Sequence, residues 1–456
     1  MKKYILNKAF GRLKKSKSNF PIQIIFSNGK ITNLSDKDPE ITIHFKTQGA
    51  EIYTLLLQNI GFTEKYRIGQ IDILGQDALR KLVRMTFELN THNKKSFNLI
   101  AYTFKFFQER KLNNKKYLQE KKNLFAHYNM PAEFFHLMTG ELYGYTEGYY
   151  ETERENQNEA QYKKYDYMCR KLLLKPNDKV VEVGSAWGTM ALLMADKYGC
   201  DVTNYGLIPE QNRIFESRVK KMGLENKIKN ENRDCRELGF EKEKYDKYVS
   251  LGVLEHAGKD CLEDWIKNIS ECLKPNGIGL ITNVGQINNS YTKYIIGKYI
   301  WRGCYFPTMS EVLELLEKYD LNLVDLEETH FLYANTMEVM LSKMLEHWDK
   351  IHAINPDLFD EKFKRIWSMY YIGSIEGFRS MNGFLHTFQY VFVKGRAEVY
   401  PKTRDFLYKK PFDTNEMYKY FVPLGQDGFK TEKNTDNMLD KDLNLPFTNN
   451  QKETIY

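Results

Sequence analysis

The sequence lacks the features typical of membrane-spanning and disulfide-rich proteins. No run of about 18 apolar residues occurs along its 456 residues, so no transmembrane helix is expected. The first residues lack the apolar core of a secretory signal. None of the six cysteines form a C-x-x-C pair, which argues against a zinc or disulfide framework. We therefore expect a cytoplasmic protein with reduced thiols and no metal.

Acidic residues are missing from the start of the chain. None occurs before Asp36, whereas this stretch holds Lys2, Lys3, Lys8, Arg12, Lys14, Lys15, Lys17 and Lys30. Residues 4–18 have the spacing of a short amphipathic helix, and such a basic helix suits an anionic membrane surface. Nucleic acid is the other anionic partner that the charge suits, and a solvated start explains it equally well.

The first 92 residues predict a basic segment followed by a small α+β domain. Alternating apolar residues and an Asn-Gly turn predict strands, and helical spacing appears twice. Gly61-Phe62 is expected to open a loop. Strands are expected at 20–26, 31–34, 41–45 and 71–74, and helices at 50–58 and 78–87. Residues 93–126 are expected to form a helical linker, with a helix followed by a charged stretch.

Residues 127–399 predict an α/β domain in which strands and helices alternate. Such alternation gives a parallel sheet with right-handed crossovers. Strands are expected at 179–184, 201–206, 227–232, 245–251 and 277–283, and helices at 159–173, 188–198, 209–222 and 260–273. Later helices are expected at 310–319 and 337–352, and a strand at 387–393 at the sheet edge. Residues 400–456 form a polar C-terminal extension, expected to be partly disordered.

The stretch 178–188 is a strand, a glycine-rich turn and the start of a helix. In an open α/β sheet this turn lies where ligands bind. Glycines allow a ligand to approach the backbone, and Glu182 favours a ligand with positive charge or hydroxyl groups. S-adenosylmethionine has an ammonium, a sulfonium and a ribose. An ordinary strand-to-helix connection explains the turn equally well.

Six motifs follow one another along the chain. They are Gly61-Phe-Thr-Glu-Lys-Tyr-Arg-Ile-Gly69, His127-Tyr128 with Phe134-Phe135, Tyr145-Thr-Glu-Gly-Tyr149, Glu182-Val-Gly-Ser-Ala-Trp-Gly188, Ser250-Leu-Gly-Val-Leu-Glu-His-Ala-Gly258 and Gly377-Phe-Arg379. In this order they resemble the cyclopropane-fatty-acyl-phospholipid synthases and related S-adenosylmethionine-dependent lipid methyltransferases. The resemblance covers roughly residues 20–396. The resemblance implies a Rossmann-like methyltransferase domain preceded by a small lipid-binding domain.

The resemblance also implies a set of cofactor-binding residues. These are Tyr145, Thr146, Glu182, Gly184, Trp187, Gly188, Gly206, Gln211, Asp234, Cys235 and Arg236. Two positions depart from the family pattern: Ala186 stands where a Gly is usual, and Gly206 replaces a common Thr. A helix-compatible backbone is expected at Ala186. Core packing is an equal alternative for the Trp187 side chain.

The implied reaction joins an electrophilic methyl group to a cis double bond of a phospholipid acyl chain. A base then removes a proton from the carbocation, which aromatic faces stabilise without trapping it. Glu255 and Tyr333 match residues that help to hold a bicarbonate base in relatives. Glu147, Thr282 and Ser374 stand where relatives have Cys, His and Cys, and all five are catalytic candidates. Glu147 is the candidate that replaces bicarbonate.

Three other functions remain open from the sequence. They are methyl branching of a lipid without ring closure, N-methylation of a small amine, and lipid binding without catalysis. The expected partners are unsaturated phospholipids at an anionic membrane, on its inner face, with no nucleic acid; a homodimer is the expected assembly if the chain associates.

Overall fold

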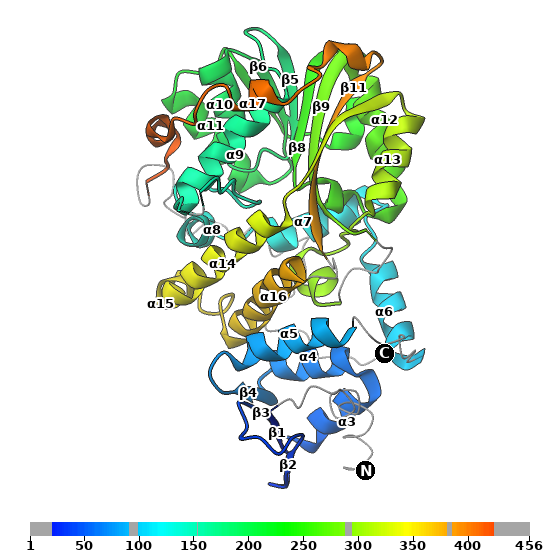
Figure 1. Ribbon diagram of the computed structural model, residues 1–456, viewed down its shortest axis with the longest axis vertical. Coiled ribbons are helices and arrows are strands. Elements are labelled where there is room, and N and C mark those ends of the chain that lie inside the picture. Colours follow the sequence, from blue (N-terminus) through cyan, green and yellow to red (C-terminus); the bar gives the residue numbers. More distant parts are fainter. Residues whose placement is uncertain (1–20, 91–98, 153, 288–293, 381–384, 424–456) are drawn as a thin grey trace.

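The computed structural model describes residues 21–90, 99–152, 154–287, 294–380 and 385–423. Two sheets divide this part of the chain into a small body and a large body (Figure 1). The expected helix at residues 4–18 lies outside the described residues. Among the described residues, no helix is long and apolar enough to cross a membrane.

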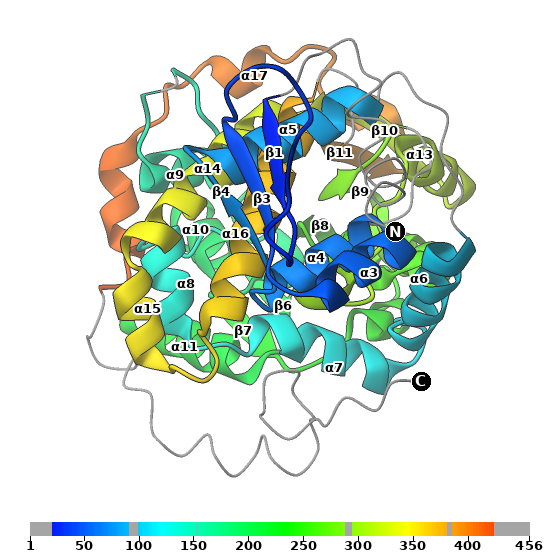
Figure 2. The same cartoon turned by 90° about the horizontal axis from the view of Figure 1, so that it is seen from below.

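The small body is a four-stranded sheet with helices on one face (Figure 2). Its strands are β1 (Ile22–Ile25), β2 (Ile31–Asn33), β3 (Ile41–Phe45) and β4 (Ile71–Leu74), in the order β2-β1-β3-β4. Its helices are α3 (Gln48–Leu57), α4 (Asn59–Arg67) and α5 (Ala78–Asn90). Ile22, Ile24, Ile41 and Ile43 are at most 1% exposed, so alternate residues of the strands form the core.

The expected loop at Gly61-Phe62 is wrong, because α4 runs through it. A Cβ on Gly61 would lie 2.2 Å from the carbonyl oxygen of Tyr53 in α3. The glycine therefore allows two helices to pack backbone to backbone, which a sequence pattern cannot distinguish from a break.

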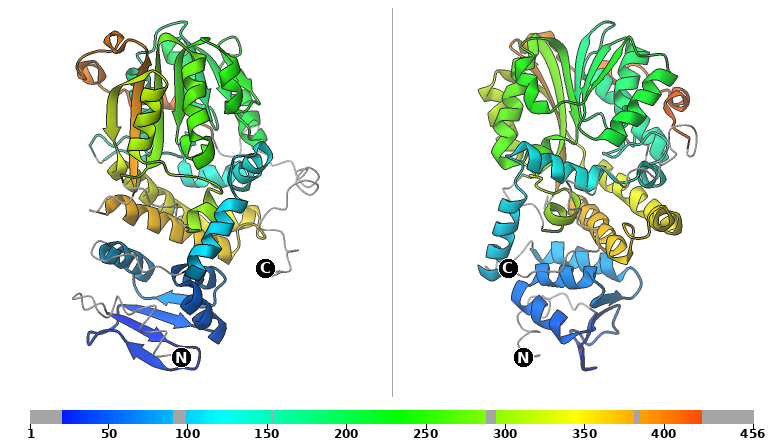
Figure 3. Two further views of the ribbon diagram at one scale, coloured as in Figure 1. Left: turned by 90° about the vertical axis from the view of Figure 1, so that its right-hand side faces the viewer. Right: turned by 180° about the vertical axis from the view of Figure 1, so that it is seen from behind.

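Two helices connect the bodies: α6 (Leu99–Lys111) and α7 (Tyr117–Tyr128). The segment expected as a helical linker is helical over these two ranges, and the charged residues of 117–126 lie within α7. In the view from behind, α7 crosses beneath the large sheet (Figure 3). The Asn114 amide donates to the backbone oxygen of His256 at 2.8 Å, so this segment belongs to the structure of the large body.

The large body has a seven-stranded sheet in the order β10-β11-β9-β8-β5-β6-β7. Five strands are parallel: β5 (Lys179–Val183), β6 (Asp201–Tyr205), β7 (Ile228–Glu231), β8 (Tyr245–Leu251) and β9 (Leu273–Gly285). β11 (His386–Lys394) pairs antiparallel with β9 and with β10 (Leu321–Glu328). The expected edge position of β11 is therefore wrong, since β10 lies outside it.

Helices cover both faces of this sheet, as in a Rossmann-like fold. One face packs against α9 (Gln157–Lys171), α10 (Thr189–Tyr198) and α11 (Pro209–Lys221), the other against α12 (Leu262–Cys272) and α13 (Met309–Lys318). Short helices follow several strands: η1 (Cys235–Phe240), η2 (Leu254–Ala257) and η3 (Lys259–Cys261).

A helical layer lies between the large sheet and the small body (Figure 1). It contains α8 (Ala132–Thr139), the π-helix η4 (Ile296–Ile300), α14 (His330–Glu346), α15 (Trp348–Ile354) and α16 (Glu361–Arg379). The helix expected at 337–352 is two helices, α14 and α15. Arg84 of α5 pairs with buried Glu376 of α16 at 2.8 Å, and Arg365 pairs with Asp72 at 2.9 Å, so charged pairs join the two bodies.

The described part of the C-terminal extension is folded onto the large body. It contains η5 (Ala397–Val399), α17 (Asp405–Tyr408) and η6 (Thr414–Tyr420). Tyr420 is 1% exposed, and its hydroxyl donates to Asp196 of α10 at 2.9 Å. The expectation of disorder is therefore wrong up to residue 423, and residues 424–456 lie outside the described part.

Candidate active site

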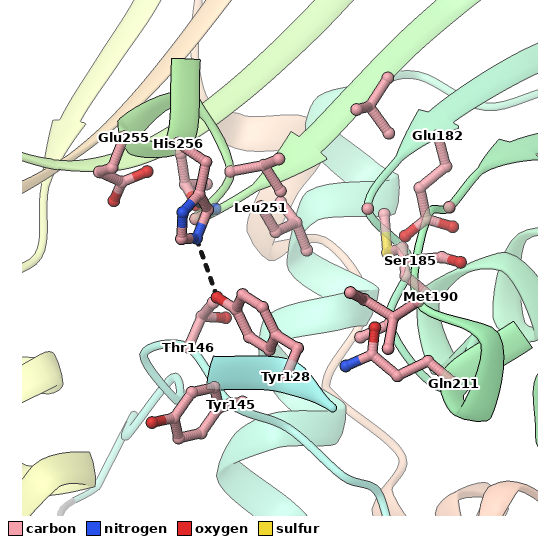
Figure 4. Close-up of a pocket in the computed structure, with 18 of the residues that line it drawn as sticks. Tyr128, Tyr145, Thr146, Glu182, Ser185, Met190, Gln211, Leu251, Glu255 and His256 are labelled. Atoms are coloured by element: carbon pink, nitrogen blue, oxygen red, sulfur yellow. Dashed lines mark hydrogen bonds between the residues drawn. The ribbon is translucent and has the colours of Figure 1, made fainter. Parts of the chain in front are cut away.

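A cavity lies at the carboxyl ends of the central parallel strands (Figure 4). Its walls come from the ends of β5, β6, β8 and β9 and the loops that follow them. Residues of α7, of the segment 143–147 and of α14 line its other side. This is the edge at which open α/β sheets bind their ligands.

The cofactor end of the cavity is formed by β5 and the loop after it. Glu182 is 3% exposed, and its Oε2 has no hydrogen-bond partner among the described residues. Ser185 Oγ and Gln211 Nε2 are likewise buried and unpaired within that part of the chain. Burial raises the pKa of Glu182 to about 8. Ammonium and hydroxyl donors on a ligand would satisfy Glu182 and Ser185, and a ligand oxygen would accept from Gln211 Nε2, so the residues fit S-adenosylmethionine.

The loop after β5 contains three residues with left-handed backbone. φ is +75° at Gly184, +51° at Ala186 and +86° at Gly188. The expected helix-compatible conformation at Ala186 is therefore wrong. A Cβ on Gly188 would lie 1.9 Å from the Phe215 ring, so this glycine is required by packing as well as by φ.

Most of the predicted cofactor-binding residues line this cavity. They are Tyr145, Thr146, Glu182, Gly184, Trp187, Gly206, Gln211 and Cys235. Trp187 is also a core residue, because its ring packs 4.7 Å from Tyr143 and 4.9 Å from Phe135. Gly188 does not line the cavity but caps α10 directly behind it.

Asp234 and Arg236 do not line the cavity. Asp234 caps η1 and accepts hydrogen bonds from the Arg236 guanidinium at 2.9 and 2.7 Å. Arg236 also pairs with Glu120 of α7 at 2.6 Å. These charges are therefore used within the protein, and Cys235 between them reaches the cavity.

The reaction end of the cavity brings together Glu147, Glu255, Thr282 and Tyr333. All four are at most 3% exposed. One Glu255 oxygen accepts a hydrogen bond from the Val284 N–H, and the other has no partner among the described residues. Burial raises the pKa of Glu255 to about 8, and the neighbouring charge of Glu147 adds to the rise. Thr282 Oγ1 accepts from the Gly252 N–H at 3.1 Å.

Glu147 is buried near the Glu255 carboxyl and near the buried Lys164. Burial raises the pKa of Glu147, and the ammonium groups of Lys164 and Lys171 oppose the rise. Lys164 of α9 donates to Thr146 Oγ1 at 2.8 Å and to Gln161 Oε1 at 2.6 Å. Burial lowers the pKa of Lys164 to about 7, while Glu147 opposes that change. Of the two alternatives to a catalytic role, exposure to solvent is wrong, whereas an interaction of Glu147 with a lysine is consistent with the nearby charge of Lys164.

Ser374 is the catalytic candidate that does not line the cavity. It is 3% exposed within α16, one turn after Tyr370 and Tyr371. Its catalytic role stays a prediction.

Aromatic rings form much of the cavity wall near the carboxyls. Tyr128, Tyr145, Trp301 and Tyr333 line it, and the Tyr333 ring stacks on Phe378 at 5.0 Å. Burial raises the pKa of Tyr145 and of Tyr333, so both phenols are neutral. Neutral rings stabilise a nearby cation through their faces and do not bind it covalently.

The sequence interpretation missed several polar residues of the cavity, among them Tyr128, His256 and Glu120. Tyr128 and His256 hydrogen-bond across it at 2.9 Å between the hydroxyl and Nε2 (Figure 4). Burial lowers the pKa of His256 to about 4, so its imidazole is neutral. Both residues stand in the quoted motifs, which was the available signal. No sequence signal pointed to Glu120, because its segment resembled a linker. Burial raises the pKa of Glu120 to about 8.

Comparison with known sequences places the chain in a family. The model of the mycolic acid cyclopropane synthetase family matches residues 115–388. A probable fatty acid methyltransferase of Pseudomonas putida is 28% identical over 62% of this chain and 72% of its own length. The cyclopropane-fatty-acyl-phospholipid synthase of Escherichia coli is 27% identical over 61% and 70%. The tuberculostearic acid methyltransferase of Mycobacterium tuberculosis is 21% identical over 84% and 90%.

Solved structures have the same fold. A cyclopropane synthase from Mycobacterium tuberculosis superposes with a TM-score of 0.55 at 23% identity, covering 60% of this chain and 98% of that one. Coclaurine N-methyltransferase superposes with a TM-score of 0.59 at 17% identity, covering 73% and 99%. The family match spans more than half of the chain and includes nearly all of the cavity. The chain therefore belongs to the mycolic acid cyclopropane synthetase family and is an S-adenosylmethionine-dependent methyltransferase with a Rossmann-like fold.

Proposed function

We propose that this enzyme transfers a methylene group from S-adenosylmethionine to the cis double bond of an unsaturated phospholipid acyl chain, giving a cyclopropane ring. The observation that carries the proposal is the reaction end of the cavity, where two buried carboxyls face a wall of neutral aromatic rings. The family match supports a lipid as the substrate class.

The residues of the reaction end would stabilise a positive charge on the acyl chain and accept a proton from it. S-adenosylmethionine, when bound, supplies an electrophilic methyl group to the alkene, which leaves positive charge on the acyl chain. The faces of Tyr128, Tyr145 and Trp301 would stabilise that charge. A carboxylate would then accept a proton from the added carbon, and the electron pair of that C–H bond closes the ring.

Glu147 is our candidate for the proton acceptor, in place of a bicarbonate ion. Its Oε1 is buried and has no hydrogen-bond partner among the described residues. All three of Glu147, Glu255 and Tyr333 line the cavity, and the charge of Glu147 raises the pKa of the other two. A raised pKa makes a carboxylate a stronger base, while Lys164 keeps part of it ionised.

Methyl branching without ring closure is the second candidate. The tuberculostearic acid methyltransferase aligns along 84% of this chain. Thr282 and Glu147 depart from the ring-forming family pattern at the base. In this reaction the proton would leave from a carbon of the acyl chain instead of from the added carbon.

Lipid analysis tests the proposal and separates the two candidates. The chain is expressed in a host without cyclopropane lipids, and phospholipid acyl chains are analysed by mass spectrometry and NMR. We expect a gain of one CH2 with loss of the alkene and with cyclopropane proton signals. An alkene retained beside a new methyl group would establish branching. If the protein is expressed and folded but the mass of the acyl chains does not change, both candidate reactions are contradicted. Glu255→Gln is the inactive control.

We also propose that the enzyme reaches its lipid at the surface of an anionic membrane. Phe107 of α6 is 63% exposed and Leu118 of α7 is 70% exposed, with Lys115 and Lys116 between these helices. Removing residues 1–18 should weaken binding to anionic vesicles, since each basic residue contributes at most about 1 kcal/mol at the surface. Sedimentation with vesicles at increasing salt measures this. Equal binding to neutral vesicles would contradict the electrostatic part.

A further inference from the structure

A second group of polar side chains lies outside the cavity, where β10, α14 and β11 meet. Glu328 ends β10, His330 begins α14 and His386 begins β11. One ligand-type atom from each of the three residues lies within 4.8 Å of the other two. None of the three lines the active-site cavity. We call these residues the His-His-Glu cluster.

The two imidazoles of the cluster point the same nitrogen at one carboxylate. His330 Nδ1 contacts both oxygens of Glu328, and His386 Nδ1 lies 3.1 Å from Glu328 Oε1. The ring centroids are 5.4 Å apart. His386 is 7% exposed, and its Nε2 has no hydrogen-bond partner among the described residues. The buried imidazole is thus held in place with its hydrogen bonding incomplete.

We propose that the His-His-Glu cluster binds one Zn²⁺ ion per chain. Two imidazole nitrogens and a carboxylate oxygen are ligands that Zn²⁺ prefers, whereas Ca²⁺ and Mg²⁺ prefer oxygen alone. Zinc bonds of about 2.0–2.2 Å in a tetrahedron place ligand atoms about 3.4 Å apart. The separations here are within 4.8 Å, so small side-chain rotations complete the site. The Glu328 side chain is 34% exposed, which leaves access for the ion and for a water ligand.

The cysteine pattern could not reveal such a site, and the sequence led us to expect no metal. The ligands come from two parts of the chain that are 56 residues apart, between His330 and His386. Only the pairing of β10 with β11, in which Glu328 lies opposite Phe388, brings them together.

The ion would be structural, and its position would connect it to the active site. Thr387, next to His386, lines the cavity, and its carbonyl accepts a hydrogen bond from the Thr329 N–H at 2.8 Å. Tyr333 lies three residues after His330 on α14. A bound ion would add a second link between the start of this helix and β11.

Metal titration of the full chain tests the site. After chelator treatment and dialysis, Zn²⁺ is titrated by calorimetry and Co²⁺ by visible absorption. We expect one ion per chain, a visible Co²⁺ band typical of tetrahedral coordination, and a melting temperature raised by Zn²⁺. Glu328→Gln and His330→Gln should each weaken binding at least tenfold and remove the Zn²⁺-dependent rise in melting temperature.

His347→Gln is the matched control. His347 follows the other end of α14, where its Nδ1 contacts the Lys343 carbonyl oxygen at 3.0 Å. This variant should bind like the wild type. If folded wild-type protein shows no saturable binding, the cluster is only hydrogen-bonded and the proposal is wrong. Unchanged binding in both cluster variants, with folding verified by circular dichroism, would equally overturn it.

Discussion

The two ends of the cavity use buried carboxyls in different ways. At the cofactor end, Glu182 is isolated, and burial alone raises its pKa. At the reaction end, Glu255 and Glu147 act on each other, and Lys164 opposes the neutralisation of Glu147. An isolated carboxyl suits the binding of a ligand that carries its own positive charge and donors. A coupled group of carboxyls and a lysine suits the movement of a proton, since its members titrate together.

The largest expected effect is a loss of turnover on substitution of Glu147, which should affect the reaction end of the cavity and not the cofactor end. Glu147→Gln keeps the shape but cannot accept a proton, so turnover should fall by about 10²–10⁴-fold, the usual contribution of a general base. Affinity for S-adenosylhomocysteine should stay within about threefold, because the cofactor end is untouched. Product formation and calorimetry measure the two quantities. Wild-type turnover should not respond to added bicarbonate.

Glu151→Gln is the control for this change. Glu151 is exposed and pairs with Lys163 at 2.8 Å, away from the cavity lining. It should leave turnover near the wild-type value. A fully active Glu147→Gln enzyme, or strong stimulation of the wild type by bicarbonate, would show that Glu147 is not the proton acceptor.

The opposite pattern is expected at the cofactor end. Glu182→Gln removes a carboxyl group that the ammonium or hydroxyl groups of a bound ligand would ionise, so affinity for S-adenosylhomocysteine should fall about 10–100-fold, as for loss of a hydrogen bond to a charged group. Turnover at saturating cofactor should change much less. Calorimetry and initial rates check this. Unchanged affinity in the folded variant would remove Glu182 from the cofactor site.

Much of this contrast could be predicted from the sequence. Glu182 and Gly184 lie on one strand-loop-helix unit, so local pattern pointed to them, whereas Gln211 on α11 was assigned only by the resemblance. The reaction end is formed by segments far apart in the chain, and only motif resemblance joined Glu147, Glu255, Thr282 and Tyr333. The cysteine and charge patterns of the sequence did not indicate that these four residues lie close together.

What could not be predicted depends on tertiary contacts. Lys164 lies on a helix whose polar face resembles a solvated one, yet it is 1% exposed beside Glu147. Glu120 lies in a segment rich in Lys and Asn, so the segment resembled a linker. In the structure this segment forms α7, and Glu120 lines the cavity. Asp234 and Arg236 likewise bond to each other beside the cavity, and their contact with the cofactor stays a prediction.

Glu182 also predicts how stability depends on pH. Its pKa is about 8 in the folded protein, against 4.5 for an ordinary exposed carboxyl. Between these values the folded protein binds more protons, so the contribution of Glu182 to the free energy of unfolding decreases as pH rises. The melting temperature of Glu182→Gln should therefore rise relative to the wild type from pH 5 to about pH 8. Calorimetric scans across this range measure the difference, and a constant difference would show that Glu182 is ionised in the folded apoprotein.

The smallest expected effect concerns the loop that connects the strand of Glu182 to α10. Ala186 has φ +51°, which costs an L-residue roughly 1–2 kcal/mol, while glycine adds about 0.5–1 kcal/mol of unfolded-state entropy. Ala186→Gly should therefore raise the free energy of unfolding by at most about 1.5 kcal/mol. The control is Ala353→Gly, at an exposed position of α15, which should lower it by about 0.5–1 kcal/mol because helical glycine is unfavourable. Urea unfolding of both variants measures the two signs, and a destabilised Ala186→Gly protein would mean that the alanine methyl contributes packing greater than the strain of its backbone.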